Sequence, residues 1–104
     1  MLTMTVIAQV KPGKRQEFLH TINSLYSNGE EEEGVKKSML YQEMNDLNNF
    51  RLIVELETRG DLKRHLRAEN FRVLLGALEI LCAKSQIRYS DLAEKGTEVL
   101  KSKP

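Results

Sequence analysis

Apolar and polar residues alternate along residues 2–10, LTMTVIAQV, where every second side chain is apolar. A period of two is that of a β-strand, in which successive side chains point to opposite faces. Similar strand-like segments recur at residues 35–44, 50–57 and 86–92. We therefore expect four strands, the second of which carries apolar groups on both of its faces.

Between the strands, apolar residues are spaced three and four apart, as in an amphipathic helix. This pattern covers residues 15–28, 61–67 and 71–83. Asn28 and Gly29 mark the end of the first helix, since both tolerate the left-handed conformation. The order β-α-β-β-α-β predicts an α+β, ferredoxin-like sandwich.

The bulk composition indicates one small domain. We place that domain at residues 1–92 and expect residues 93–104 to form a polar C-terminal tail. No apolar run reaches 18 residues, so no membrane span is expected, and the N-terminus lacks the pattern of a signal peptide. A single cysteine fits a reducing, cytoplasmic environment. The net charge of +1 with interspersed acids and bases gives no reason to expect a nucleic-acid or membrane partner.

One face of the expected sheet is covered by helices, and the opposite face has a mixed character. It would carry Ile7, Ile53 and either Met39 or Leu40. The same face would carry polar side chains as well, namely Thr3, Thr5, Gln9, Arg51 and Glu55. Such a face is too apolar for open water and too polar for a dry core. We therefore expect a homodimer that pairs two sheet faces.

A more specific signal is the stretch ELETRGDLKRHLRAENF, between the third strand and the long apolar helix at residues 71–83. It resembles the antibiotic biosynthesis monooxygenase-like (ABM) family, whose fold is a dimeric α+β barrel. In that family a strand ends in Glu-x-Trp-x-Ser and is followed by a His and then a Phe. His65 and Phe71 match this pattern, and Thr58 replaces the Ser. Leu56 stands in the position of the Trp, and Val54 in that of the Glu.

The resemblance implies a cofactor-independent monooxygenase that acts on a small aromatic or quinol-like substrate. His65 is then the candidate catalytic residue, at the mouth of an apolar cleft between sheet and helices. The residues expected to line that cleft and bind the substrate are Val6, Leu52, Val54, Leu56, Phe71, Leu75 and Leu78. The haem-degrading branch uses an Asn, a Trp and a His where this chain has Val6, Leu56 and Leu75, which argues against haem.

Structural alternatives accompany each of these candidates. His65 lies beside Leu62 and Leu66, so it could simply hydrogen-bond the end of a strand or helix. Cys82 lies on an apolar stripe and is expected to be a buried, inert thiol. No metal site is expected, because the two histidines lack ligand spacing. The alternative function is a non-catalytic dimeric module that binds a small ligand or a partner.

Overall fold

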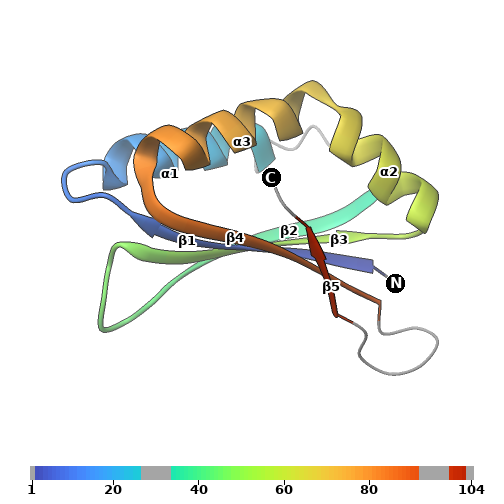
Figure 1. Cartoon of the computed structure of the whole chain (residues 1–104), viewed down its shortest axis with the longest axis horizontal. Coiled ribbons are helices and arrows are strands. Elements are labelled where there is room, and N and C mark those ends of the chain that lie inside the picture. The colour runs from blue at the N-terminus through green and yellow to red at the C-terminus, as the bar shows by residue number, and fades with distance from the viewer. Residues whose placement is uncertain (1, 27–33, 92–98, 103–104) are drawn as a thin grey trace.

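The computed structural model describes residues 2–26, 34–91 and 99–102. Its three helices are α1 (Arg15–Tyr26), α2 (Arg59–Arg67) and α3 (Glu69–Leu81). Its strands are β1 (Leu2–Val10), β2 (Val35–Gln42), β3 (Asn49–Leu56), β4 (Cys82–Asp91) and β5 (Val99–Ser102). The helices cover one side of the sheet and leave the other side uncovered by any described element (Figure 1). The expected α+β sandwich is therefore confirmed.

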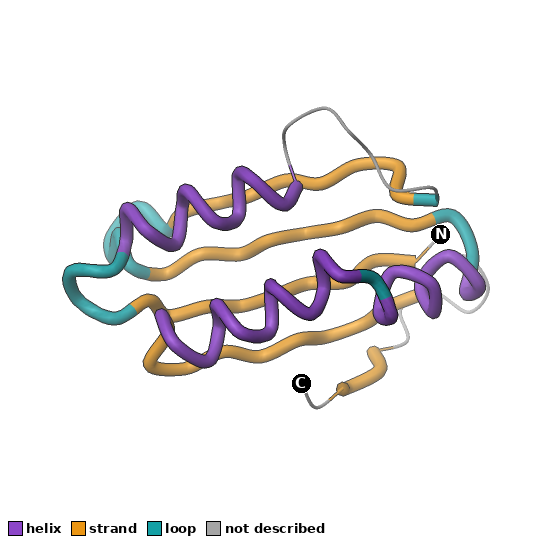
Figure 2. The backbone as a smooth tube through the Cα atoms, turned by 90° about the horizontal axis from the view of Figure 1, so that it is seen from above, coloured by secondary structure: helices purple, strands orange, loops and turns teal. Residues whose placement is uncertain are grey.

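The strands form one antiparallel sheet in the order β2-β3-β1-β4-β5. β1 lies in the middle, with Val6 opposite Leu52 of β3 and Ile87 of β4. α1 and α3 run side by side above the sheet (Figure 2). This ferredoxin-like arrangement brings the end of α1 close to the start of α3, although the two lie far apart in sequence.

Several element boundaries differ from the expected ones. β4 begins at Cys82 rather than residue 86, because α3 ends at Leu81 and the chain turns directly into the sheet. α2 begins at Arg59 rather than Asp61, because the Thr58 side chain caps the helix by accepting a hydrogen bond from the Asp61 N–H at 3.1 Å. The other differences amount to one or two residues, the usual uncertainty at element ends.

Within the expected polar tail, residues 99–102 pair with β4 as a fifth strand. The rest of the expected tail, 92–98 and 103–104, lies outside the described residues, as does the expected end of the first helix at Asn28 and Gly29. No helix in the described part of the chain is long and apolar enough to cross a membrane.

A register shift in β2 changes which of its residues share a face. Strict alternation gives Val35 the same face as Met39 and Tyr41. The register shifts between Val35 and Lys37, so that Val35 pairs with Leu56 and Lys37 with Glu55. An extra residue in one strand reverses the alternation beyond it. Val35 therefore packs against the core below the helices.

The core lies between the sheet and the helices. Alternate residues of β1, β3 and β4 meet the apolar stripes of α1 and α3, and the largest fully buried side chains are Phe18, Met4, Leu56, Leu74, Ile87, Val6, Val10 and Val54. On the opposite face Met39 pairs with Ile53, which identifies Met39 rather than Leu40 as the apolar residue of that face. Ile7 and Ile53 are half-buried there. That exposed face keeps the mixed character from which a dimer was expected.

Candidate functional site

Most of the residues expected to line a cleft are packed in the core. Val6, Val54, Leu56 and Leu78 are each at most 3% exposed. Phe71 is 7% exposed, and Leu75 is half-buried. Of the expected set, Leu52 is the residue that also lines the groove described next. The remaining apolar positions close against one another, as is usual where a strand face meets a helix stripe.

A groove of about 410 Å³ opens between α1 and the edge strand β2. This is within the usual size range of a small-molecule site. The described residues that line it are Gln16, Leu19, His20, Ile22, Asn23, Tyr26, Ser38, Met39, Leu40 and Leu52. None of them carries a carboxylate, an ammonium or a guanidinium group. The groove therefore suits an uncharged, largely apolar ligand that carries hydrogen-bonding groups.

The α1 wall of the groove is divided into a deep and a shallow part. Ile22 is buried and Tyr26 is half-buried, so these side chains lie next to the core. Gln16, His20 and Asn23 follow one another at helical spacing and are exposed. A ligand in the groove would thus meet an apolar inner surface and a polar outer lip.

The Tyr26 hydroxyl connects this groove to the buried histidine. It lies 3.1 Å from Nε2 of His65, and the direction of the hydrogen bond depends on the imidazole tautomer. His65 is only 2% exposed. Its ring lies 5.8 Å from the ring of Tyr26 and 5.8 Å from that of Phe71, centroid to centroid. His65 is therefore linked to the groove wall through its contact with Tyr26.

The end of α1 is held by side chains from two other elements. Ser38 of β2 donates a hydrogen bond of 2.7 Å to the Tyr26 carbonyl oxygen. Asn70 of α3 donates one of 3.2 Å to the Leu25 carbonyl oxygen. The last carbonyls of a helix have no partner within the helix, so these bonds satisfy two of them. They also fix the backbone from which the Tyr26 side chain extends.

The other candidates of the sequence lie away from the groove. Cys82 is buried, and burial raises the pKa of its thiol above the usual value, with a smaller opposing effect of Lys11. This matches the expected inert thiol. Tyr41 is exposed on β2 and Tyr89 is buried on β4. Neither of these tyrosines lines the groove.

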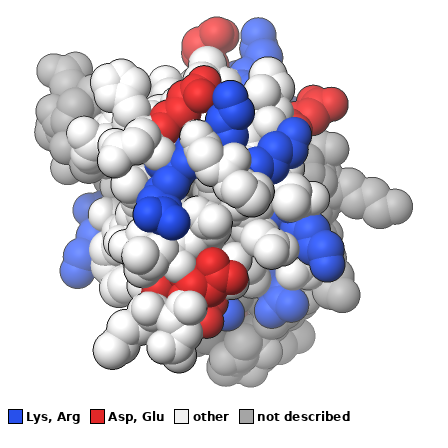
Figure 3. Space-filling model, turned by 90° about the vertical axis from the view of Figure 1, so that its left-hand side faces the viewer, with Lys and Arg blue, Asp and Glu red and all other residues white. Residues whose placement is uncertain are grey.

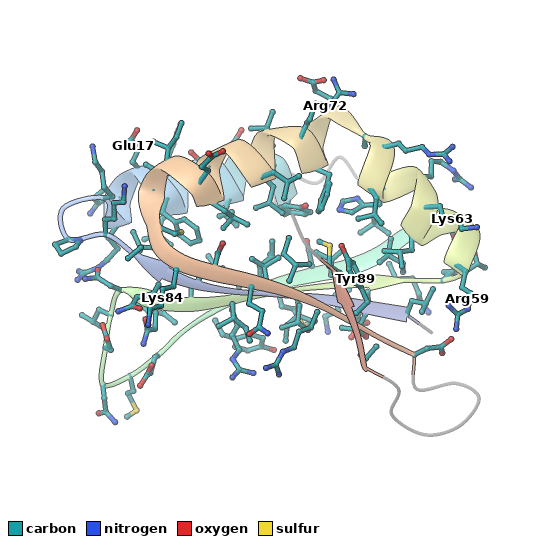
Figure 4. All side chains as sticks on the ribbon, in the orientation of Figure 1. Glu17, Arg59, Lys63, Arg72, Lys84 and Tyr89 are labelled. Atoms are coloured by element: carbon teal, nitrogen blue, oxygen red, sulfur yellow. The ribbon has the colours of Figure 1, made fainter. Side chains whose placement is uncertain are left out.

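Different charged side chains lie at the two ends of the molecule. Arg59 and Lys63 lie at the α2 end, whereas Glu17 and Lys84 lie at the opposite end (Figure 4). At the first end Arg59 pairs with the buried carboxylate of Asp91 at 3.3 Å. The opposite end carries acidic and basic side chains close together (Figure 3). Such mixed charge is typical of a solvated surface.

Sequence reasoning missed both the groove and the contact of Tyr26 with His65. It identified His65, but the partner lies 39 residues away on another helix. The sequence offered one signal for Tyr26, namely its position at the end of the apolar stripe of the first helix. His20 is exposed on α1, and it also forms part of the groove lip.

Comparison with known proteins agrees with this architecture. Residues 1–75 match the family model described as antibiotic biosynthesis monooxygenase. A Bacillus subtilis protein named "Putative monooxygenase YcnE" is 26% identical over 95 residues, which cover 90% of this chain and 100% of that protein. A conserved protein from Methanosarcina mazei has 28% identity and a TM-score of 0.76, over 85% of this chain and 88% of its own.

A solved structure described as an antibiotic biosynthesis monooxygenase has 18% identity and a TM-score of 0.75, with both chains fully covered. At that identity the similarity concerns the fold. The family model, in contrast, spans well over half of the sequence. This chain belongs to the antibiotic biosynthesis monooxygenase family.

Proposed function

We propose that this protein is a cofactor-independent monooxygenase that oxygenates a small aromatic or quinol-like substrate in the groove between α1 and β2. The observation that carries the proposal is Tyr26, a residue of the groove wall whose hydroxyl is hydrogen-bonded to the buried His65. In this proposal Tyr26 contacts an oxygen of the substrate. His65 orients the Tyr26 hydroxyl and acts on the substrate through it.

The chemistry needs a substrate that gives electrons directly to dioxygen. Removal of a proton from an activated C–H or ring hydroxyl produces an electron-rich anion, and dioxygen adds to its carbon. After protonation, the hydroperoxide loses water and leaves a carbonyl, so that one oxygen atom enters the product and the other leaves as water. The apolar inner surface supports this reaction, since a low-dielectric site strengthens the hydrogen bonds aimed at the developing charge.

The second candidate function is a non-catalytic module that binds an apolar ligand in the same groove. It is favoured by Leu56, which occupies the position of the family's Trp and is 0% exposed in the core. That position therefore offers no side chain to a ligand in the groove. Binding of a phenol or quinol without consumption of oxygen would support this alternative.

The test measures oxygen uptake by the purified, chelator-treated protein with phenols, anthrones and quinols. Leu40, on the groove wall of β2, is 36% exposed, so Leu40→Trp should fill the groove and abolish uptake without disturbing the core. The matched control is Ile80→Trp, at a 66% exposed position on α3. Equal effects of the two substitutions would contradict the placement of the site.

We also propose that two copies pair through their uncovered sheet faces. This face is hollowed by about 1000 Å³ and lined partly by Ile7, Tyr41 and Arg51. Half-buried isoleucines beside polar groups favour a partner of the same composition, because an isologous contact can satisfy both kinds of side chain. The groove lies between α1 and the edge strand β2, whose Met39 contributes both to the groove and to the uncovered face.

A further inference from the structure

We infer that His20, on the lip of the groove, is the base that takes the proton from the substrate, while His65 is a positioning residue for Tyr26. This inference rests on the proposed function. It assigns the catalytic base to the histidine that the sequence pattern places on a water-facing helix position.

The argument begins with the titratable side chains of the groove. Among the described residues that line it, His20 and Tyr26 are the ones with a titratable side chain. A phenol ordinarily titrates near pH 10, so near neutral pH tyrosine is a hydrogen-bond donor rather than a base. Imidazole exists in its unprotonated form at neutral pH and is the commonest general base. His20 is therefore the lining residue suited to accept a proton.

The surroundings of the two histidines differ in the way that this role requires. His65 is 2% exposed, and its Nε2 already lies 3.1 Å from the Tyr26 hydroxyl. A proton on His65 would have to pass through Tyr26 to reach the groove. His20 is exposed, so its imidazole can contact the ligand and can also exchange protons with water.

The spacing along α1 indicates the kind of substrate that could meet both groups. His20 and Tyr26 are six residues apart, which corresponds to roughly 9 Å along a helix axis. A fused two-ring ligand with oxygen functions at its opposite ends has this reach. One oxygen would accept a hydrogen bond from Tyr26, and the acidic hydrogen would lie near His20.

The proton that the substrate loses is carried by His20 and is returned to the same substrate within the groove. The His20 imidazole takes the proton of the substrate and becomes an imidazolium. The substrate anion then forms a carbon–oxygen bond with dioxygen, and the electrons of that bond come from the substrate. The imidazolium returns the proton to the terminal peroxide oxygen. The O–O bond then breaks with loss of hydroxide, the remaining C–H bond of that carbon gives up its proton to the hydroxide to form water, and the electron pair left behind forms the carbonyl. His20 is again neutral.

The experiment compares wild type with His20→Gln and His20→Ala, using 4-nitrophenol as a binding probe and a panel of anthrones and naphthols as substrates. Bound 4-nitrophenolate absorbs differently from the bound phenol, so the spectrum reports proton transfer without turnover. We expect His20→Gln to bind the probe but to lower its ionised fraction. With a substrate that the wild type oxidises, we expect the kcat of His20→Gln to fall by about 100-fold or more, the usual effect of removing a general base.

Two further readouts distinguish a base from a structural residue. Added imidazole should restore activity to His20→Ala, and the acidic limb of the kcat/KM profile should disappear in His20→Gln. The control is Glu17→Gln, an exposed position on the same helix that does not line the groove. It should behave as wild type.

The possible results of this experiment test the role of His20 and the proposed oxygenation separately. If wild type oxidises a substrate and His20→Gln keeps its rate and pH profile, the inference is overturned and the proposed function stands. If His20 controls the ionisation of the bound probe but no substrate is oxidised, the inference about proton transfer is supported and the oxygenation is not. If the probe does not bind wild type, both are overturned.

Discussion

The Tyr26 hydroxyl lies 3.1 Å from Nε2 of His65, so the last residue of α1 is linked to a buried side chain of α2. This contact joins the wall of the groove to the interior of the protein. The aromatic ring of Phe71 also lies near the imidazole, with 5.8 Å between the ring centroids. Tyr26 is thus held by its side chain at His65 and by its backbone at Ser38.

Tyr26→Phe should affect both stability and ligand binding. It removes the hydroxyl and keeps the ring, so the free energy of unfolding should fall by about 1 kcal/mol, the usual net value of one hydrogen bond. Urea unfolding measures this change, and titration with a naphthol should show weaker binding. The control is Tyr41→Phe, whose hydroxyl is exposed. Unchanged stability and unchanged affinity in Tyr26→Phe would contradict the role given to this contact.

Leu56→Trp tests whether the family's Trp position still faces a ligand. Leu56 is 0% exposed, so the larger indole should overpack the core and cost about 1–3 kcal/mol of unfolding free energy. Because Leu56 does not line the groove, the affinity of the folded variant for a naphthol should stay close to that of wild type. Strongly weakened binding with unchanged stability would instead indicate a ligand site at Leu56.

The fold followed from local patterns, whereas the groove depended on contacts that the sequence does not display. A period of two was enough to assign Leu52 and Val54 to the core face of β3. It failed at Val35, because a bulge changes the register without a strong sequence signal. The apolar positions expected to line a cleft are mostly buried in the core, where strand face and helix stripe meet.

The contact between Tyr26 and His65 could not be deduced from spacing either. It depends on how the end of α1 meets α2, and the two residues are 39 positions apart. The groove does not lie where the cleft was expected. It is displaced toward the edge of the sheet, because α1 lies beside the edge strand β2. Helix placement across a sheet is a tertiary property, whereas hydrophobic periodicity reports only which face of each element is buried.

Ile53→Lys tests the proposed dimer. Ile53 is half-buried on the uncovered sheet face, where an ammonium group would lose its water when the two faces pair. Light scattering should give twice the chain mass of 12.0 kDa for wild type and a single chain mass for the variant. Val73→Lys, on the exposed side of α3, should remain dimeric. A monomeric wild-type protein at micromolar concentration would refute the proposal.

Cys82 should make the stability of the protein depend on pH under alkaline conditions. Burial raises the pKa of the folded thiol, so the unfolded chain loses this proton first as the pH rises. The stabilisation is therefore fully present below the ordinary pKa of the thiol and is lost as the pH rises through the raised value. The difference in unfolding free energy between wild type and Cys82→Ala should shift in favour of the variant over this window. A difference that is independent of pH would show that the thiol is not desolvated.

The most direct test of the central claim is the fate of isotopically labelled dioxygen with a quinol or anthrone that the chelator-treated protein consumes. We predict that one labelled oxygen atom enters the aromatic product and the other appears in water, with one dioxygen consumed per product. Leu40→Trp should abolish this incorporation, because its indole fills the groove between α1 and β2. Absence of oxygen consumption across the substrate panel, or incorporation that survives Leu40→Trp, would contradict direct oxygenation in this groove.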